Sequence, residues 1–314
     1  MNSQIYLSLV VPCYNEEESV PLFYKKVITH LFPPPPPVLG NLEIIFVDDG
    51  SKDNTLKIIK NLSEKDNRVH FVSFSRNFGK EAALLAGMTT AKGEYIATLD
   101  VDGQDPPSLI PEMLKVVSSG EYDCAGTRRV TRKGEPPVRS FFARRFYAIM
   151  KHITDIDIVD GARDFRLMNR KYLEAVLSLP ERNRFSKGIF PWIGFRVKWF
   201  EYENIERKAG ETKWSFWKLF WYSLDGIAAF STKPLAISSL MGIILFLASL
   251  LGIIVVVIRK IVWNNSAFGW ASMVCIILLC SGLQLFTSGI LGQYLAKTYT
   301  EVKQRPYYII KEAR

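Results

Sequence analysis

Two long stretches without a charged side chain lie near the C-terminus of this 314-residue chain. The first covers residues 234–258 and the second covers residues 261–296, and most of their residues are apolar. A helix that crosses the hydrocarbon core of a bilayer needs about 20 apolar residues. Buried helices of a soluble protein are the alternative, but they seldom continue so far without a charge. We therefore expect a two-helix transmembrane hairpin over residues 234–296, with its turn near residues 263–266.

The positive charge of the chain is concentrated around these stretches. The whole chain has 40 Lys and Arg against 31 Asp and Glu, a net charge of +9, but residues 1–206 contribute 28 basic and 27 acidic side chains, only +1. Nine basic residues flank the hairpin, against Arg259 and Lys260 inside it. Because basic flanks stay in the cytoplasm, we expect both termini to be cytoplasmic in a multi-pass protein of the cell membrane. This distribution fits an anionic leaflet and does not support nucleic acid as a partner.

An aromatic segment precedes the first apolar stretch. Residues 214–231 contain three Trp and one Tyr together with Lys218. Such a segment fits an amphipathic helix at the bilayer surface, and a helix packed between two parts of the chain is the alternative. The expected organisation is a cytoplasmic domain over residues 1–213, a juxtamembrane amphipathic segment over 214–233, the hairpin over 234–296 and a basic cytoplasmic tail over 297–314.

Strand-like and helical stretches alternate in the N-terminal part of the chain. Strands are predicted at residues 5–11, 42–47, 69–74 and 95–99, and helices at 16–31, 54–63, 80–90 and 108–118. This alternation is typical of a Rossmann-like α/β domain, in which helices cover both faces of a parallel sheet and ligands bind beyond the carboxyl ends of the strands. Neither a Gly-x-Gly-x-x-Gly turn nor a Gly-Lys-Ser/Thr loop is present, which argues against dinucleotide dehydrogenases and P-loop NTPases.

Acidic residues follow two of the predicted strands. Asp100 and Asp102 flank one residue, and Gln104 follows them. Two carboxylates and an amide oxygen are suitable ligands for Mg²⁺ or Mn²⁺, which would bridge to a diphosphate. An acidic turn that caps the next helix is the alternative. Asp48 and Asp49 end a neighbouring strand, where a carboxylate can accept hydrogen bonds from a ribose or a base.

A basic run follows at residues 126–145, with seven Lys and Arg against one Glu. Arg binds phosphate groups through two parallel hydrogen bonds, so the run fits a second anionic group. A solvated loop or a membrane-surface patch is equally compatible with it. Arg207 and Lys213 add phosphate-binding capacity just before the aromatic segment. Asp164 is a candidate base or orienting group with Arg166 as its partner, or the two form a plain salt bridge.

Five motifs in this order resemble one known family. They are VVPCYNEE at residues 10–17, VDDGS at 47–51, DVDGQDPP at 100–107, GARDFRLM at 161–168 and RKAGETKW at 207–214. The chain resembles the polyprenyl-phosphate glycosyltransferases of glycosyltransferase family two, which include dolichyl-phosphate mannose synthases and bacterial undecaprenyl-phosphate glucosyltransferases. The resemblance covers essentially the whole chain, and the C-terminal hairpin is most similar to the bacterial branch. It implies a GT-A fold, a nucleotide-sugar donor and a divalent metal.

The resemblance also implies roles for particular residues. The nucleotide would be bound by Pro12, Tyr14, Glu16, Asp48, Asp49 and Asp100. The metal would be held by Asp100, Asp102 and Gln104, and the catalytic residues would be Asp102 and Asp164. The lipid phosphate would be bound by Arg128, by one of Arg139, Arg144 and Arg145, by Lys213 and, from its position, by Arg207.

The reaction implied is inverting transfer of one sugar from a nucleotide sugar to a polyprenyl phosphate. UDP-glucose or UDP-N-acetylglucosamine is the expected donor, undecaprenyl phosphate the expected acceptor, and the product would serve cell-envelope glycosylation. The alternatives are a mannosyltransferase that uses GDP-mannose and a non-catalytic membrane scaffold. A processive synthase is disfavoured because no Gln-x-x-Arg-Trp motif is present. A homo-oligomer, a flippase and a downstream transferase are further possible partners.

Overall fold

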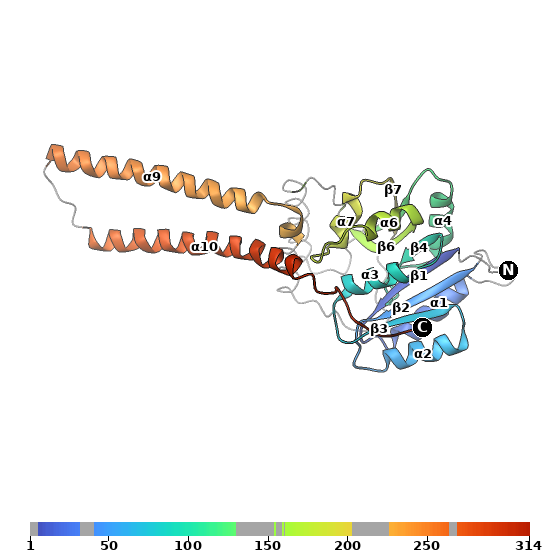
Figure 1. The fold of residues 1–314 in the computed structure, drawn as a ribbon. Helices are drawn as coiled ribbons and strands as arrows, with labels where there is room; N and C mark the ends of the chain where they lie inside the picture. Colours follow the sequence, from blue (N-terminus) through green and yellow to red (C-terminus); the bar gives the residue numbers. More distant parts are fainter. Residues whose placement is uncertain are drawn as a thin grey trace. The chain divides into compact units, whose positions relative to one another are not determined.

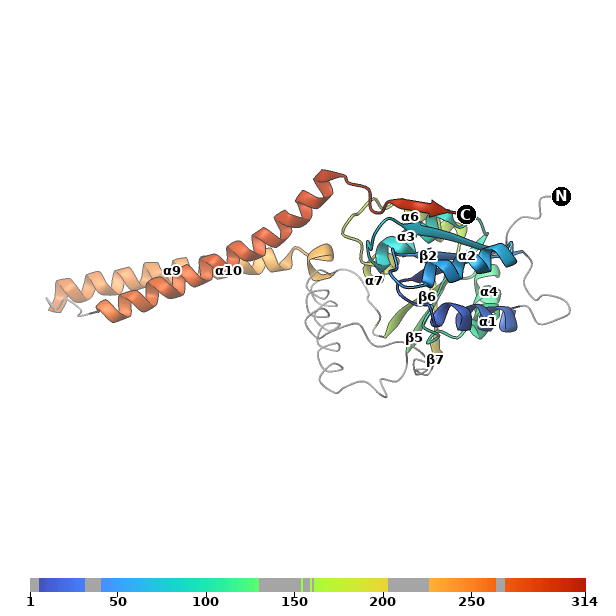
Figure 2. The ribbon, with the colours of Figure 1, turned by 90° about the horizontal axis from the view of Figure 1, so that it is seen from below.

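The computed structural model describes residues 6–31, 41–129, 154, 159, 161–202, 226–263 and 269–314. The chain forms two compact units. Unit 1 comprises residues 1–223 and 305–314, and unit 2 comprises residues 224–304. Figure 1 shows the ribbon of both units, and Figure 2 shows it from below.

A mixed sheet of eight strands forms the centre of unit 1, in the order β7-β5-β6-β4-β1-β2-β3-β8. The strands are β1 (Leu7–Cys13), β2 (Leu42–Asp48), β3 (Val69–Phe74), β4 (Tyr95–Thr98), β5 (Cys124–Arg129), β6 (Ala162–Asn169), β7 (Val197–Tyr202) and β8 (Ile310–Ala313). β1 to β4 are mutually parallel. β6 runs antiparallel to β4 and β5, β7 runs parallel to β5, and β8 runs antiparallel to β3.

Helices cover both faces of this sheet (Figure 2). They are α1 (Ser19–Leu31), α2 (Thr55–Lys65), α3 (Lys80–Thr90), the 3₁₀ turn η1 (Pro107–Leu109), α4 (Ile110–Ser118), α6 (Arg170–Leu177) and α7 (Ser186–Trp192). α1 and α4 pack on the face of Leu7 and Leu9. α3 lies on the other face, where Gly87 lets it approach closely, because a Cβ there would come within 2.3 Å of Val10. With both faces covered, all of β2 is buried, which explains its continuous apolar sequence.

The α/β architecture predicted from the sequence is confirmed. All eight elements expected between residues 5 and 118 are present, and β3 and α3 have the predicted bounds. The four predicted strands are mutually parallel, as expected, but the sheet as a whole is mixed, because β6 and β8 are antiparallel to their neighbours. The regular alternation of strand and helix, on which that expectation rested, ends after α4.

The C-terminal segment differs from the expected basic tail. Residues 297–303 belong to helix α10, and Ile310–Ala313 form β8 at the edge of the sheet. Phe71 and Arg314 exchange two backbone hydrogen bonds of 3.1 and 3.0 Å. Tyr308 stacks on the buried ring of Phe74, with ring centroids 4.9 Å apart. The end of the chain is therefore part of unit 1.

Unit 2 contains two long helices, α9 (Lys233–Trp263) and α10 (Trp270–Lys303), which contact each other. Lys233–Ile258 and Met273–Lys303 are long and apolar enough to cross a membrane. The hydroxyl of Tyr294 in α10 donates a 2.6 Å hydrogen bond to the carbonyl of Ser231, just before α9. The helices predicted from the uncharged stretches are thus both present. The aromatic residues 214–225 lie outside the described part of the chain.

Removal of residues 305–314 is expected to destabilise unit 1, because it strips β3 of its partner and exposes an apolar edge strand. In detergent, the thermal midpoint should fall by roughly 5–10 °C and the protein should aggregate more readily. Lys311→Ala, at an exposed position of β8, is the control and should leave the midpoint within about 1 °C. An unchanged midpoint after truncation would contradict a stabilising role for β8.

Candidate active site

The carboxyl ends of β1, β2 and β4 lie side by side at one edge of the sheet. Cys13 at the end of β1 is in register with Asp48 at the end of β2, and Val10 is in register with Thr98 at the end of β4. The polar residues that follow these strands are therefore gathered on one side of unit 1. This is where ligands bind in open sheets with parallel strands.

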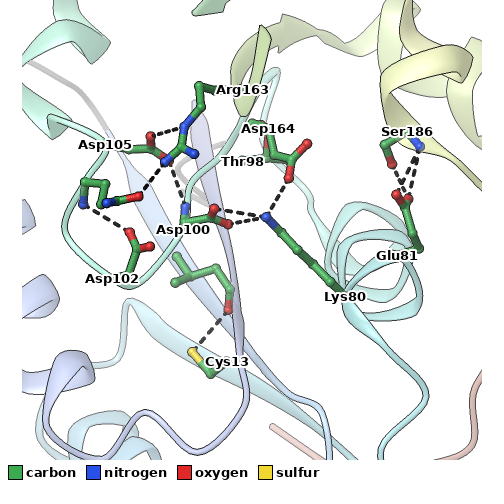
Figure 3. Close-up of polar contacts among 12 residues, drawn as sticks. Cys13, Lys80, Glu81, Thr98, Asp100, Asp102, Asp105, Arg163, Asp164 and Ser186 are labelled. Carbon is green, nitrogen blue, oxygen red and sulfur yellow. Dashed lines mark hydrogen bonds and ion pairs between the residues drawn. The ribbon is translucent and has the colours of Figure 1, made fainter. Parts of the chain in front are cut away.

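Lys80 lies between two of these carboxylates (Figure 3). Its ammonium nitrogen is 2.7 Å from Oδ1 and 2.9 Å from Oδ2 of Asp100, in the loop after β4. The same nitrogen is 2.5 Å from Oδ2 of Asp164 in β6. Thr98 fixes the backbone here, since its hydroxyl donates to the carbonyl oxygen of Asp164. One cation from α3 thus joins two acidic residues that are far apart in the sequence.

These ion pairs determine the charge state of the cluster. Burial acts to raise the pKa of Asp164, but the neighbouring ammonium groups of Lys80 and Lys187 lower it more, and the net shift is well below the ordinary value. Burial acts to lower the pKa of Lys80, and the carboxylates of Asp100 and Asp164 raise it above its ordinary value. Asp164 is therefore a carboxylate, and Lys80 an ammonium ion, at neutral pH.

A second ion pair lies beneath the loop after β4. Asp105 is 1% exposed, and its Oδ1 is 3.5 Å from Nε of Arg163 and accepts a 2.7 Å hydrogen bond from the hydroxyl of Tyr202. Its Oδ2 accepts a hydrogen bond from the backbone N–H of Asp100. Arg163 also donates to Oε1 of Gln104, at 3.1 Å. β6 and β7 therefore hold the loop from below through polar contacts.

Asp100 and Asp102 are the residues of this loop that best suit a cation. The backbone N–H of Gln104 donates to Oδ1 of Asp102, which closes a tight turn around Gly103. In the part of the chain that the structure describes, no three His, Cys, Asp or Glu side chains gather as metal ligands. That Asp100 and Asp102 hold a divalent ion, with its remaining ligands from phosphate and water as Mg²⁺ and Mn²⁺ prefer, stays a prediction. Gln104 is already engaged by Arg163, so its place as a ligand stays a prediction.

Asp48 and Asp49 are both buried, and each accepts hydrogen bonds from the protein. Asp48 accepts a 3.1 Å hydrogen bond from the backbone N–H of Ser51 and a 2.8 Å hydrogen bond from the hydroxyl of Ser73. Asp49 accepts from the backbone N–H groups of the loop that leads into α3 (Phe78 and Gly79), at 2.6 and 2.9 Å. Burial raises the pKa of Asp49, against these hydrogen bonds. Asp48 and Asp49 thus shape the loops around the site. Their contact with a nucleotide remains a prediction.

Gly50 explains why the loop before α3 can lie so close to Asp49. Its φ is +66°, and a Cβ at this position would come within 2.5 Å of the backbone of Arg76. Only glycine meets both demands without strain. The turn Asp48-Asp49-Gly50-Ser51 therefore holds the start of α3, and with it Lys80, at the edge of the sheet.

The loop after β1 is tied to the loop after β2. The backbone N–H of Asn15 donates to Oγ of Ser51 at 2.9 Å, and that of Glu16 donates to Oγ1 of Thr55 at 2.7 Å. Pro12, Tyr14 and Glu16 lie in this part of the chain and are only partly buried. The predicted nucleotide residues are thus at the expected edge of the sheet. Their role in binding the nucleotide remains a prediction.

The predicted lipid-phosphate residues are mostly beyond the described ranges. Arg139, Arg144, Arg145, Arg207 and Lys213 all lie outside them. Arg128 is described, and its guanidinium pairs with the carboxylate of Glu201 in β7, with both side chains exposed to solvent. Its predicted role is neither supported nor opposed by this pair.

The pairing of Asp164 with Arg166 is wrong. Arg166 is 2% exposed, and its guanidinium is 4.4 Å from the ring centroid of Phe190 and 5.1 Å from that of Trp199. The partner of Asp164 is Lys80. Lys80 and Tyr202 are not recognisable as site residues from the sequence motifs, and Asp105 and Arg163 had no predicted role. One signal was available, since Lys80 follows a loop that ends in Gly79 and opens a predicted helix.

A mixed sheet of this order, with an acidic cluster at the ends of its parallel strands, is a GT-A-like architecture. The structure of glucosyl-3-phosphoglycerate synthase from Mycobacterium tuberculosis, in complex with Mn²⁺, UDP and phosphoglyceric acid, has this fold. The match covers 71% of this chain and 76% of the synthase chain, with a TM-score of 0.50 and 18% sequence identity. The sequence profile of glycosyl transferase family 2 matches residues 8–177. This chain belongs to that family and is a glycosyltransferase.

Several relatives match over nearly the whole chain. The bactoprenol glucosyl transferase of Shigella phage SfII is 40% identical over 309 residues, which cover 98% of this chain and 98% of that protein. The prophage bactoprenol glucosyl transferase homolog of Escherichia coli K12 is 39% identical over 310 residues, or 98% of this chain and 99% of the relative. An uncharacterised glycosyltransferase of Synechocystis is 40% identical over 308 residues, or 98% and 95%. The similarity therefore includes the C-terminal helices.

Arg163→Met is expected to lower the free energy of unfolding by about 3 kcal/mol, because it leaves the buried carboxylate of Asp105 without its counter-ion. The thermal midpoint in detergent should fall by roughly 6–12 °C. Arg196→Met is the control, since Arg196 is 64% exposed and its pair with Asp123 spans 3.9 Å; this change should cost less than about 1 kcal/mol. Equal midpoints for the two variants would show that the Asp105–Arg163 pair does not stabilise the loop.

Proposed function

We propose that this protein transfers one glucose from UDP-glucose to undecaprenyl phosphate, or to another polyprenyl phosphate, at the cytoplasmic face of the cell membrane. The observation that carries the proposal is the near full-length similarity to bactoprenol glucosyl transferases. The acidic cluster and the two long apolar helices are consistent with it. UDP-N-acetylglucosamine as donor, GDP-mannose as donor, and a scaffold without activity are the alternatives that the experiment separates.

The proposed reaction is a single displacement at the anomeric carbon. A phosphate oxygen of the lipid forms the new bond to that carbon. The bond from the carbon to the diphosphate oxygen breaks, and the electron pair leaves with UDP. A phosphate monoester is mostly ionised at pH 7, so the nucleophile needs no base. This agrees with a carboxylate at Asp164 that is held ionised by Lys80.

Different residues of this chain would have different roles in this reaction. Asp100 and Asp102 would hold a divalent cation against the diphosphate, and such an ion supplies charge stabilisation to the leaving group. Asp164 would stabilise positive charge that develops on the sugar ring, rather than move a proton. The loop after β1, with Tyr14 and Glu16, would receive the nucleoside. The basic residues between 128 and 145, with Lys213, would bind the lipid phosphate.

The proposal includes a topology for the membrane part. Residues up to 223 and from 305 onwards belong to unit 1, and β8 pairs with β3. This supports placing both ends of the hairpin on one side of the membrane. The basic flanks support the cytoplasm as that side. Both helices would then cross the bilayer, with the connecting residues 264–268 on the far side.

Membranes that contain the protein, given a panel of nucleotide sugars and undecaprenyl phosphate, should yield a lipid whose mass increases by one hexose with UDP-glucose. Asp102→Ala should lower the rate at least about 10²-fold, because it removes a carboxylate from the proposed cation site. Glu64→Ala, an exposed acid on α2, is the matched control and should retain the wild-type rate. A product formed only from GDP-mannose would identify the mannosyltransferase alternative. No product from any donor would favour the scaffold.

A cysteine introduced by Asn265→Cys, in a variant without the native cysteines, should react with a membrane-impermeant thiol reagent added outside intact cells or spheroplasts. Lys311→Cys should react only after the membrane is permeabilised, because β8 belongs to the cytoplasmic unit. Labelling followed by gel electrophoresis measures both. Labelling of both positions from the same side would contradict two crossings.

A further inference from the structure

We propose that Lys80 is a positioning residue that occupies the acidic cluster as an internal cation. It holds Asp100 and Asp164 together before the divalent ion binds, and it competes with that ion for Asp100. This inference rests on the proposed function for the identity of the reaction, but its central test measures ion binding alone.

The side chain of Lys80 is 40% exposed, but its contacts differ from those of a simple surface salt bridge, because one ammonium pairs with two carboxylates from different elements. Both carboxylate oxygens of Asp100 lie within 2.9 Å of its nitrogen, and Asp164 is 2.5 Å away. Asp100 and Asp164 come from different elements and are mostly buried, with side chains 21% and 19% exposed. Without a cation between them, these two carboxylates would repel each other. The ammonium therefore offsets this repulsion where the loop after β4 meets β6.

The backbone of Lys80 is fixed on both sides, so the side chain reaches the cluster from a rigid base. On one side, the carboxylate of Asp49 accepts the N–H groups of Phe78 and Gly79, immediately before Lys80. On the other side, the partly buried carboxylate of Glu81 accepts hydrogen bonds from the backbone N–H of Ser186, at 3.1 Å, and from its hydroxyl. The first turn of α3 is thus anchored to β2 and to α7.

The position of Asp100 makes the competition specific. Asp100 is one of the two carboxylates that fit a divalent cation, and both of its oxygens are already engaged by Lys80. A divalent ion that binds here must share or displace this ammonium. Removal of the ammonium should therefore make the ion bind more tightly, although it should make the reaction slower because Asp164 loses its orientation. A residue that merely stabilises the fold, or that binds the diphosphate, would not produce these two opposite effects.

The test compares the full-length wild type with Lys80→Met, Lys80→Arg and the control Lys57→Met, which removes an exposed lysine from α2. Mn²⁺ is titrated into each protein in detergent without nucleotide, and its dissociation constant is measured by electron paramagnetic resonance. Lys80→Met should bind Mn²⁺ about tenfold more tightly, because a positive charge within a few ångströms is gone. Lys80→Arg and Lys57→Met should bind it as the wild type does. Thermal midpoints identify any variant that fails to fold.

Turnover measurements complete the test. Lys80→Met should lower kcat about 10²-fold and change the KM for the donor less than threefold, which is the effect expected of a misplaced catalytic group. Lys80→Arg should recover part of the loss. The double variant Lys80→Met with Asp164→Asn should be no slower than Asp164→Asn alone, because Lys80 acts through Asp164.

Two results would overturn the inference. Mn²⁺ affinity that is unchanged or weaker in a folded Lys80→Met protein would show that Lys80 does not compete for Asp100. A rise in KM with unchanged kcat would make Lys80 a ligand of the donor instead. Failure of the proposed function has a different signature, since the wild type would then make no lipid-linked sugar while the Mn²⁺ titrations still decide the role of Lys80.

Discussion

Three carboxylates gather at the end of β4 because cations lie among them. Asp100, Asp105 and Asp164 converge at the end of β4, and Lys80 and Arg163 separate them. The close-packed apolar core fixes the positions of the strands relative to one another. The ion pairs then determine where individual oxygen atoms lie. The chemistry of the site depends on these ion pairs, through which α3, the loop after β4 and β6 meet by charge rather than by apolar contact.

Two pairs of aspartates that look alike in the sequence have different surroundings. Asp48 and Asp49 are buried and accept hydrogen bonds from backbone N–H groups and serine hydroxyls. Asp100 faces a lysine and is partly open to solvent. The first pair shapes the loops that bring α3 to the site, and the second pair presents charge. A carboxylate at a strand end is thus not a functional residue by position alone, because its hydrogen-bond partners decide what it is free to bind.

Much of the fold could be predicted from the sequence, because the signals were local. Apolar runs such as Leu42–Asp48 and helical stretches such as Lys80–Thr90 are recognisable from a few neighbouring residues. The antiparallel placement of β6 and β8 was missed, because strand direction depends on where the chain returns, which no local pattern records. In the site, Asp100, Asp102 and Asp164 were found from motifs. Lys80 was missed because its partners are 20 and 84 residues away. Arg166 was misassigned because its distance from Asp164 in sequence says nothing about the aromatic rings that enclose it.

The pairing of β8 with β3 has a consequence for how the protein is made. β3 is synthesised early, whereas β8 is the last strand of the chain, and both long helices of unit 2 lie between them in the sequence. The sheet therefore reaches its final width only after the ribosome has completed α9 and α10. Until then β3 is an open edge on a nascent chain. Completion of the sheet is in this way tied to unit 2, because β8 can pair with β3 only after both long helices have left the ribosome.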